Sequence, residues 1–179
     1  MKCIPFSVAG TALTWITLLS AVLSPMQVNA FDSQKLEDFK TTNVCKYCDL
    51  TNAALTTRDM RGADFQNANL SGADLSKADL SPRVMEKRTL KSNFESSNLR
   101  KADLRQSKLL GANFASAYLR ETILDEADLT EANLTGANLK NASLKGTVLK
   151  GANLEAAKLD DAVFCNTTMP DGSTNNTGC

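Results

Sequence analysis

Large apolar residues recur at every fifth position along most of the chain. From 94 to 164 all fifteen of these positions hold Leu or Phe, and the residue two places before each is Ala, Ser or Thr. A shorter run from 50 to 80 places Leu, Met or Phe at seven positions in the same way. Its small-residue column contains one large residue, Arg58. Because an unpaired guanidinium is costly in an apolar interior, we expect residues 56–60 to form an irregular side.

This period of five residues matches neither an α-helix nor a flat strand. On a helix five residues advance by about 500°, which scatters the apolar residues around the axis, and on a strand an odd period sends them to alternate faces. Short extended segments joined by regular turns satisfy the pattern, because the large and the small residue of each repeat then point inward. Stacked turns of this kind would pair their backbones about 4.8 Å apart. The pattern therefore predicts an all-β solenoid in which each unit buries its apolar face against its neighbours.

The regular pattern is interrupted between Leu80 and Phe94, which are fourteen residues apart, one short of three repeats. The interrupting segment, 81–91, contains Pro82, which cannot donate to a sheet ladder, so we expect the segment to bulge from the coil. Its net charge of +3 comes from Glu86 and four basic residues, Arg83, Lys87, Arg88 and Lys91. Two interpretations stay open: a docking loop for a partner, and a solvated insertion.

The first thirty residues have the composition of a secretory signal peptide. Lys2 precedes an uncharged stretch with an apolar centre at 11–23, and Val28, Asn29 and Ala30 close it. This centre of about 13 residues is shorter than the roughly 20 needed to span a bilayer. We therefore expect cleavage after Ala30 rather than a retained anchor, and no stable membrane insertion afterwards. The exported chain would carry a formal charge of −1.

The chain has no histidine, and its 20 basic and 20 acidic residues balance. The absence of histidine removes the Ser-His-Asp and Cys-His nucleophile systems and the two-histidine metal sites. The sequence contains no other nucleophile–base pair, metal cluster or glycine-rich phosphate loop, so we expect no enzymatic activity, no cofactor and no metal. The neutral overall charge gives no indication of a nucleic-acid partner.

Runs such as GADFQNANLSGADLSKADL (62–80) and EADLTEANLTGANLKNASLKGTVLKGANL (126–154) resemble the pentapeptide-repeat family. The resemblance spans about 48–164 and implies a right-handed quadrilateral β-helix, with one pentapeptide per side and four per coil. Twenty-two repeats would then make 5.5 coils, about 26 Å of stacked sheet. Around this helix we expect an N-terminal cap over 31–47, with a short helix carrying Leu36 and Phe39, and a C-terminal cap over 165–179 with a Pro-Asp-Gly turn.

Four cysteines follow the predicted signal: Cys45, Cys48, Cys165 and Cys179. In an exported chain an even number favours disulfides. The two pairs would lie near opposite ends of a coil about 26 Å tall, whereas a disulfide tolerates a Cα–Cα distance of roughly 7 Å. The remaining pairings are Cys165–Cys179, which would tie down the C-terminal cap, and Cys45–Cys48. The Cys45-x-x-Cys48 segment resembles the start of many cyanobacterial members of the family. It is compatible with a structural pair, bonded or as two thiols, with a redox site and with a metal site.

One flat side of the coil offers a further candidate surface. Arg100, Arg120 and Lys140, followed by Asp160, would stack about 4.8 Å apart. This column is either a recognition face or a solvated face with cross-coil ion pairs such as Arg100 with Glu121. Some members of the family resemble duplex DNA and bind DNA gyrase, but that mimicry requires a strongly acidic surface and the cytosol, which disagree with a charge of −1 and an export signal.

The sequence therefore predicts a non-catalytic scaffold of the periplasm or thylakoid lumen, monomeric or weakly self-associating, that binds an unknown protein partner and no nucleic acid. The opposing hypothesis is a thiol–disulfide redox protein that uses Cys45 and Cys48.

Overall fold

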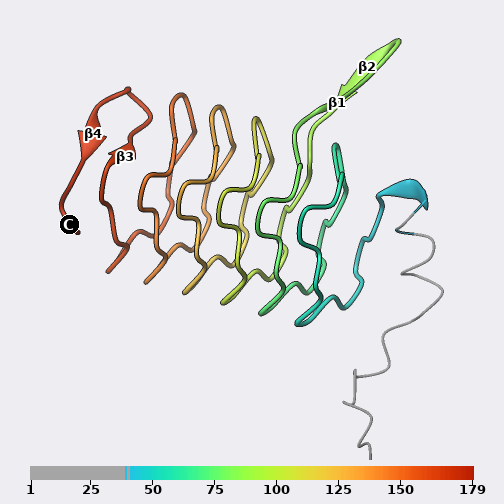
Figure 1. Ribbon diagram of the computed structural model, residues 1–179, viewed down its shortest axis with the longest axis horizontal. Helices are drawn as coiled ribbons and strands as arrows, with labels where there is room; N and C mark the ends of the chain where they lie inside the picture. The colour runs from blue at the N-terminus through green and yellow to red at the C-terminus, as the bar shows by residue number, and fades with distance from the viewer. Residues whose placement is uncertain (1–38, 40) are drawn as a thin grey trace, which may run out of the picture.

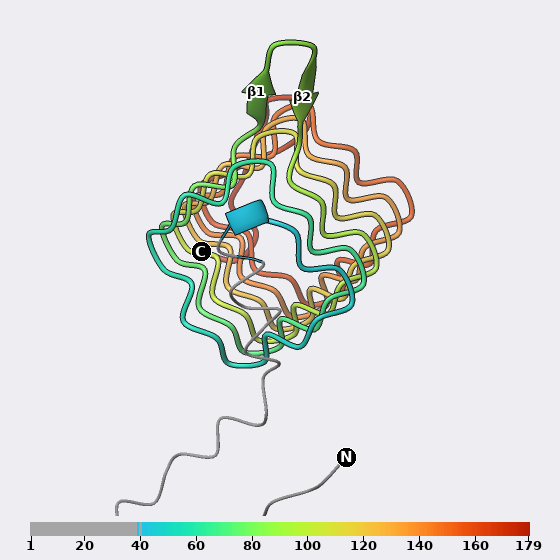
Figure 2. The same cartoon turned by 90° about the vertical axis from the view of Figure 1, so that its right-hand side faces the viewer.

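The computed structural model describes residue 39 and residues 41–179, so the predicted signal peptide at 1–30 and the predicted helix position Leu36 lie outside the described residues. The described chain winds into a coil whose successive turns stack in parallel (Figure 1). Parallel bridges join residues 20 positions apart, as in the column Asn93, Asn113, Asn133 and Asn153. Seen along its axis, the coil has a square outline (Figure 2). One five-residue repeat therefore forms each side.

A single repeat shows how the sequence forms a side and a corner. The Asn133 N–H donates to the Ala112 carbonyl in the coil before (2.9 Å), and the Leu134 N–H donates to the Asn153 carbonyl in the coil after (2.8 Å). Leu134 itself points inward and is 0% exposed. The corner that follows contains Gly136 at φ 65°, a left-handed conformation that glycine adopts without a steric penalty. The chain turns at each corner through the residue two places after the large apolar one.

Aromatic rings stack along the core at the N-terminal half of the coil. The ring centroids of Phe39 and Phe65 are 5.2 Å apart, those of Phe65 and Phe94 are 5.1 Å apart, and those of Phe94 and Phe114 are 4.7 Å apart. Each of the four rings is at most 1% exposed. These spacings match the distance between paired strands, so successive coils place their rings directly over one another.

Hydroxyl groups inside the coil all have hydrogen-bond acceptors. Ser97, for example, donates to the Phe94 carbonyl (2.7 Å), and Thr122 donates to the Leu99 carbonyl (2.8 Å). The buried hydroxyls that donate to main-chain carbonyls are those of Ser92, Ser97, Ser107, Thr122, Thr147 and Thr167. Because each donor is paired, Ser and Thr can replace Ala in the small inward column without a buried unpaired group.

The side at 56–60 keeps a more regular backbone than the sequence predicts. Asp59 still bridges to Asp79, and Met60 is 1% exposed. Thr57 takes the corner conformation at φ 55°. The side chain of Arg58 is instead exposed to solvent, so the cost of burying its charge is avoided without a break in the coil.

The coil begins one side earlier than the boundary predicted at residue 48. Val44 bridges to Asp64, and the Cys45 N–H donates to the Asp64 carbonyl (2.7 Å). Cys45 consequently takes the inward position that Leu occupies in later repeats. Before it, residues 39, 41 and 42 are helical, and Phe39 covers the first ring of the core stack.

Four short strands form two antiparallel hairpins, and the first strand of the second hairpin continues the last side of the coil, where Thr168 bridges to Val148. Strands β1 (Arg83–Met85) and β2 (Arg88–Leu90) form one antiparallel hairpin, and β3 (Thr167–Thr168) and β4 (Thr174–Asn175) form another. The second hairpin turns through Gly172 at φ 85°, within the Pro-Asp-Gly segment where the sequence predicts a turn. Over the described part of the chain, no helix has the length and apolarity needed to cross a membrane.

Candidate interaction surfaces

The segment predicted to bulge from the coil is a β-hairpin that projects from one corner beyond the square outline (Figure 2). Its register pairs Arg83 with Leu90, Val84 with Thr89 and Met85 with Arg88. Residues that bridge between neighbouring coils are 20 positions apart in the sequence elsewhere, but 29 positions apart across the hairpin, as Asp64 and Asn93 are. Nine residues, 82–90, are therefore inserted within one corner of the coil. The inward columns on both sides keep their register.

The base of this hairpin is packed against the coil. A Cβ atom built on Gly62 would lie 2.9 Å from the Leu90 Cβ and 3.0 Å from the Arg83 Cβ, so only glycine permits this approach. The Ser92 hydroxyl donates to the Leu80 carbonyl (2.7 Å) and joins the two ends of the insertion. These contacts fix where the hairpin leaves the coil.

The hairpin presents unpaired positive charge together with apolar side chains. Within the described residues, none of Arg83, Lys87, Arg88 and Lys91 forms a salt bridge. Val84 is 80% exposed and Met85 is 44% exposed. The hairpin therefore exposes cations and aliphatic side chains together.

The predicted basic column is partly neutralised. Arg100, Lys101 and Arg120 place nitrogen atoms 3.3, 3.6 and 3.1 Å from the Glu121 carboxylate. Desolvation alone would raise the pKa of Glu121, but the charges of Arg100, Lys101 and Arg120 outweigh it and lower that pKa below its usual value. Lys140 lies 3.8 Å from Asp161. The expected pair of Arg100 with Glu121 is present, and the column has fewer free cations than its sequence suggests.

The four cysteines form two disulfides, at opposite ends of the described coil. Cys45 and Cys48 are bonded with their Cα atoms 5.5 Å apart, and each residue is 4% exposed. Burial of this kind keeps other thiols away from the sulfur atoms, which disfavours thiol–disulfide exchange. Among the described residues no group of three or more His, Cys, Asp or Glu side chains could hold a metal ion.

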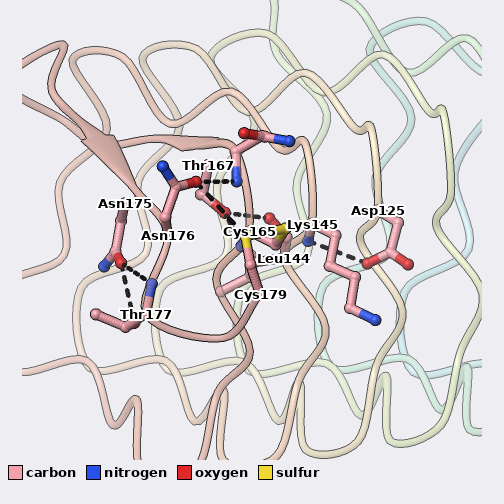
Figure 3. The surroundings of a disulfide bond; sticks show 10 residues. Asp125, Leu144, Lys145, Cys165, Thr167, Asn175, Asn176, Thr177 and Cys179 are labelled. Carbon is pink, nitrogen blue, oxygen red and sulfur yellow. Dashed lines mark hydrogen bonds between the residues drawn. A yellow bond between two sulfur atoms is a disulfide. The ribbon is translucent and has the colours of Figure 1, made fainter.

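The second disulfide joins Cys165 to Cys179, with their Cα atoms 4.9 Å apart, and closes the C-terminal segment onto the coil (Figure 3). The Asn166 N–H donates to the Asn176 side chain (2.7 Å), and the Gly178 N–H donates to the Phe164 carbonyl (2.6 Å). These bonds hold the segment over one side of the last coil.

A shallow surface depression at one corner carries charges of both signs. Its Arg105 is bound to Asp103, and its Gln106 donates to Glu126 (2.7 Å). Arg105, Gln106 and Glu126 are therefore already bonded to side chains of the coil. Its lining residues are Ser76, Lys77, Arg105, Gln106, Asp125 and Glu126.

The stacked five-residue sides define a β-helical repeat scaffold. The family model for pentapeptide repeats matches eight copies in this chain, over residues 46–81, 91–125 and 112–151. The chain therefore belongs to the pentapeptide-repeat proteins, whose fold is a right-handed β-helix. The gap between the first two matched ranges coincides with the hairpin.

Several solved structures are similar to this chain. The pentapeptide repeat protein Rfr23 from Cyanothece 51142 is 27% identical and covers 77% of this chain and 99% of its own, with a TM-score of 0.45. HetL from Nostoc sp. strain PCC 7120 is 31% identical and covers 74% of this chain and 66% of its own, with a TM-score of 0.41. A thylakoid-lumen protein from Arabidopsis thaliana is 27% identical, covers 70% and 85%, and has a TM-score of 0.32. Comparison with curated proteins gives no match.

Proposed function

We propose that this chain is an exported, non-catalytic scaffold of the periplasm or thylakoid lumen that presents its hairpin, residues 82–90, to a protein partner. The observation that carries the proposal is the anchored hairpin, whose three cations have no intramolecular salt bridge among the described residues and whose Val84 is 80% exposed. A near-neutral coil with a fixed basic projection suits recognition of an acidic partner surface.

Two features support the exported location. The N-terminal thirty residues have the pattern of a cleaved secretory signal. Both disulfides would be stable in an oxidising compartment and would be reduced in the cytosol. N-terminal sequencing of the chain recovered from fractionated cells tests this location. A chain that keeps its first thirty residues in the cytosolic fraction would contradict it.

The docking role is tested by affinity capture from periplasmic and lumenal fractions with two variants. Deletion of residues 82–90 joins Ser81 to Lys91 and restores the sequence Leu80-Ser-Lys-Ser-Asn-Phe94, an ordinary pentapeptide corner, so the coil should fold normally. The double variant R83E/R88E keeps the hairpin and reverses its charge. We expect both variants to lose a partner that the wild-type chain captures. Identical sets of captured proteins for all three chains would refute the docking role.

A further inference from the structure

The coil ends in a turn that is only partly covered. Leu154 and Leu159 in the last coil are half-buried, whereas Leu134 and Leu139, which occupy the same columns one coil earlier, are 0% and 1% exposed. The C-terminal segment covers the side that contains Phe164 and leaves the two preceding sides without a following coil (Figure 1). We call residues 152–162 the open end.

Backbone polar groups at the open end lack partners within the described residues. The Leu134 N–H donates to the following coil at 2.8 Å, but the N–H groups of Leu154 and Leu159 donate no hydrogen bond. Likewise the Ala137 carbonyl accepts a bond of 2.9 Å from the following coil, and the Ala157 carbonyl accepts none. Free donors and acceptors beside apolar side chains form an edge to which another extended segment can add.

The charge on the open end is opposite to that on the hairpin. Its exposed charged residues are Glu155, Lys158, Asp160 and Asp161, which give a net charge of −2. Two open ends facing each other would therefore place acid against acid. The segment 81–91 carries +3 and offers Val84 and Met85 to the half-buried leucines. The two surfaces of this one chain are complementary in charge and in apolar content.

The hairpin cannot satisfy its own open end. It leans toward the end of the coil where the chain enters, away from the C-terminus (Figure 1). Each of its strands has three residues, enough to lie along one five-residue side of a coil. Contact between these surfaces therefore requires two molecules.

We infer that the hairpin β1–β2 of one molecule docks on the open end of a second copy of this chain. This inference rests on the proposed docking role of the hairpin and names its partner. Because the two surfaces differ, the contact is heterologous and does not close on itself, so each dimer keeps a free hairpin and a free open end. A hairpin covers less area than a stable dimer interface, so the association is weak and sensitive to salt.

Sedimentation velocity tests this inference on the chain purified after expression of the full-length sequence. The protein concentration runs from about 10 µM to about 1 mM, the range in which so small an interface would associate. Two double variants are compared with wild type. R83E/R88E reverses the hairpin, and E155K/D160K reverses the open end. None of these four side chains makes a salt bridge within the described residues, so both variants should fold, which circular dichroism verifies.

We expect the wild-type sedimentation coefficient to rise with concentration without reaching a plateau at low salt, and each variant alone to remain monomeric. An equimolar mixture of the variants should associate again, because the intact hairpin meets an intact open end and the acidic, reversed hairpin meets a basic, reversed open end. Wild type that stays monomeric over the whole range, or R83E/R88E that still associates, would overturn the inference. If wild type stays monomeric while the deletion of 82–90 still loses a captured protein, the docking role stands and only the second copy as partner is refuted.

Discussion

Leu134 and Leu154 occupy the same position in successive coils, but only Leu134 has a coil on both sides. Leu134 is 0% exposed, and its column continues to Phe114 in the coil before and to Leu154 in the coil after. Backbone bonds fix the spacing of these coils, so the cavity left by Leu134→Ala cannot close. We expect this substitution to lower the free energy of unfolding by about 3–4 kcal/mol, within the range for buried leucines.

Leu154→Ala is the matched control, because it makes the same chemical change in the same column. Leu154 is half-buried and has no following coil, so water already reaches part of its side chain. We expect a loss of about 1 kcal/mol, since a smaller apolar area leaves the core and no closed cavity forms. The difference between the two variants therefore measures how well the last coil is covered.

Guanidinium denaturation followed by circular dichroism measures both values. The slope of the free energy against denaturant concentration should be unchanged, which shows that the same surface is exposed on unfolding. Losses that agree within about 0.5 kcal/mol would refute the argument, because they would mean that Leu154 is buried as fully as Leu134. Such a result would also remove the open end on which self-association depends.

Three further predictions concern single features of the coil. Hydrogen bonds from Arg61 lower the pKa of Asp59 to about 2. Because this value lies below the unfolded value of 3.8, the stability that Asp59 contributes is present above about pH 4 and is lost as pH falls toward 2. The chain has no histidine, so its denaturation midpoint should stay constant from about pH 5 to 8. A marked change of the midpoint between pH 5 and 8 would contradict this expectation. In urea denaturation, Gly62→Ala should destabilise the chain more than Gly136→Ala. Both glycines have φ 65°, but the nearest atom to an added Cβ is 2.9 Å away at Gly62 and 3.8 Å away at Gly136. Equal losses of stability would show that the hairpin base moves freely. Mild reductant followed by alkylation and mass spectrometry should label the exposed Cys179 and its partner before the buried Cys45–Cys48 pair, and the reverse order would revive the redox hypothesis.

The inward columns could be predicted from the sequence because burial restricts side-chain size at every repeat. Leu134 and its equivalents follow this rule, and so does the small column, in which Ser97 and Thr122 find carbonyl acceptors. The period itself does not give the number of sides; that number came from the resemblance to a family. Arg58 shows the limit of the size rule, because one long side chain can turn outward while its backbone stays regular.

The candidate surfaces were less predictable, because they depend on geometry at corners. The segment 81–91 has no alternation of buried and exposed residues, since β1 is exposed throughout, so its hairpin gives no period-two signal. The sequence did indicate the pair of Arg100 with Glu121. The convergence of Lys101 and Arg120 on the same carboxylate requires knowledge of how neighbouring corners stack.

The repeat also explains why function is to be sought at its irregularities. In an ordinary repeat two residues fill the core, and the side chain of the residue between them often stabilises the corner. Asn133 does so by accepting a hydrogen bond from the Thr135 N–H (3.1 Å). A further residue must adopt a positive φ, but it can be Gly136, Glu121 or Lys101, so the two corner positions of each repeat carry most of the variable chemistry. Isolated free positions spread over a coil rarely assemble a catalytic group. The hairpin escapes these constraints and the open end lacks a following coil, so both remain exposed, whereas Cys45 and Cys48 are buried, which disfavours redox chemistry at that pair.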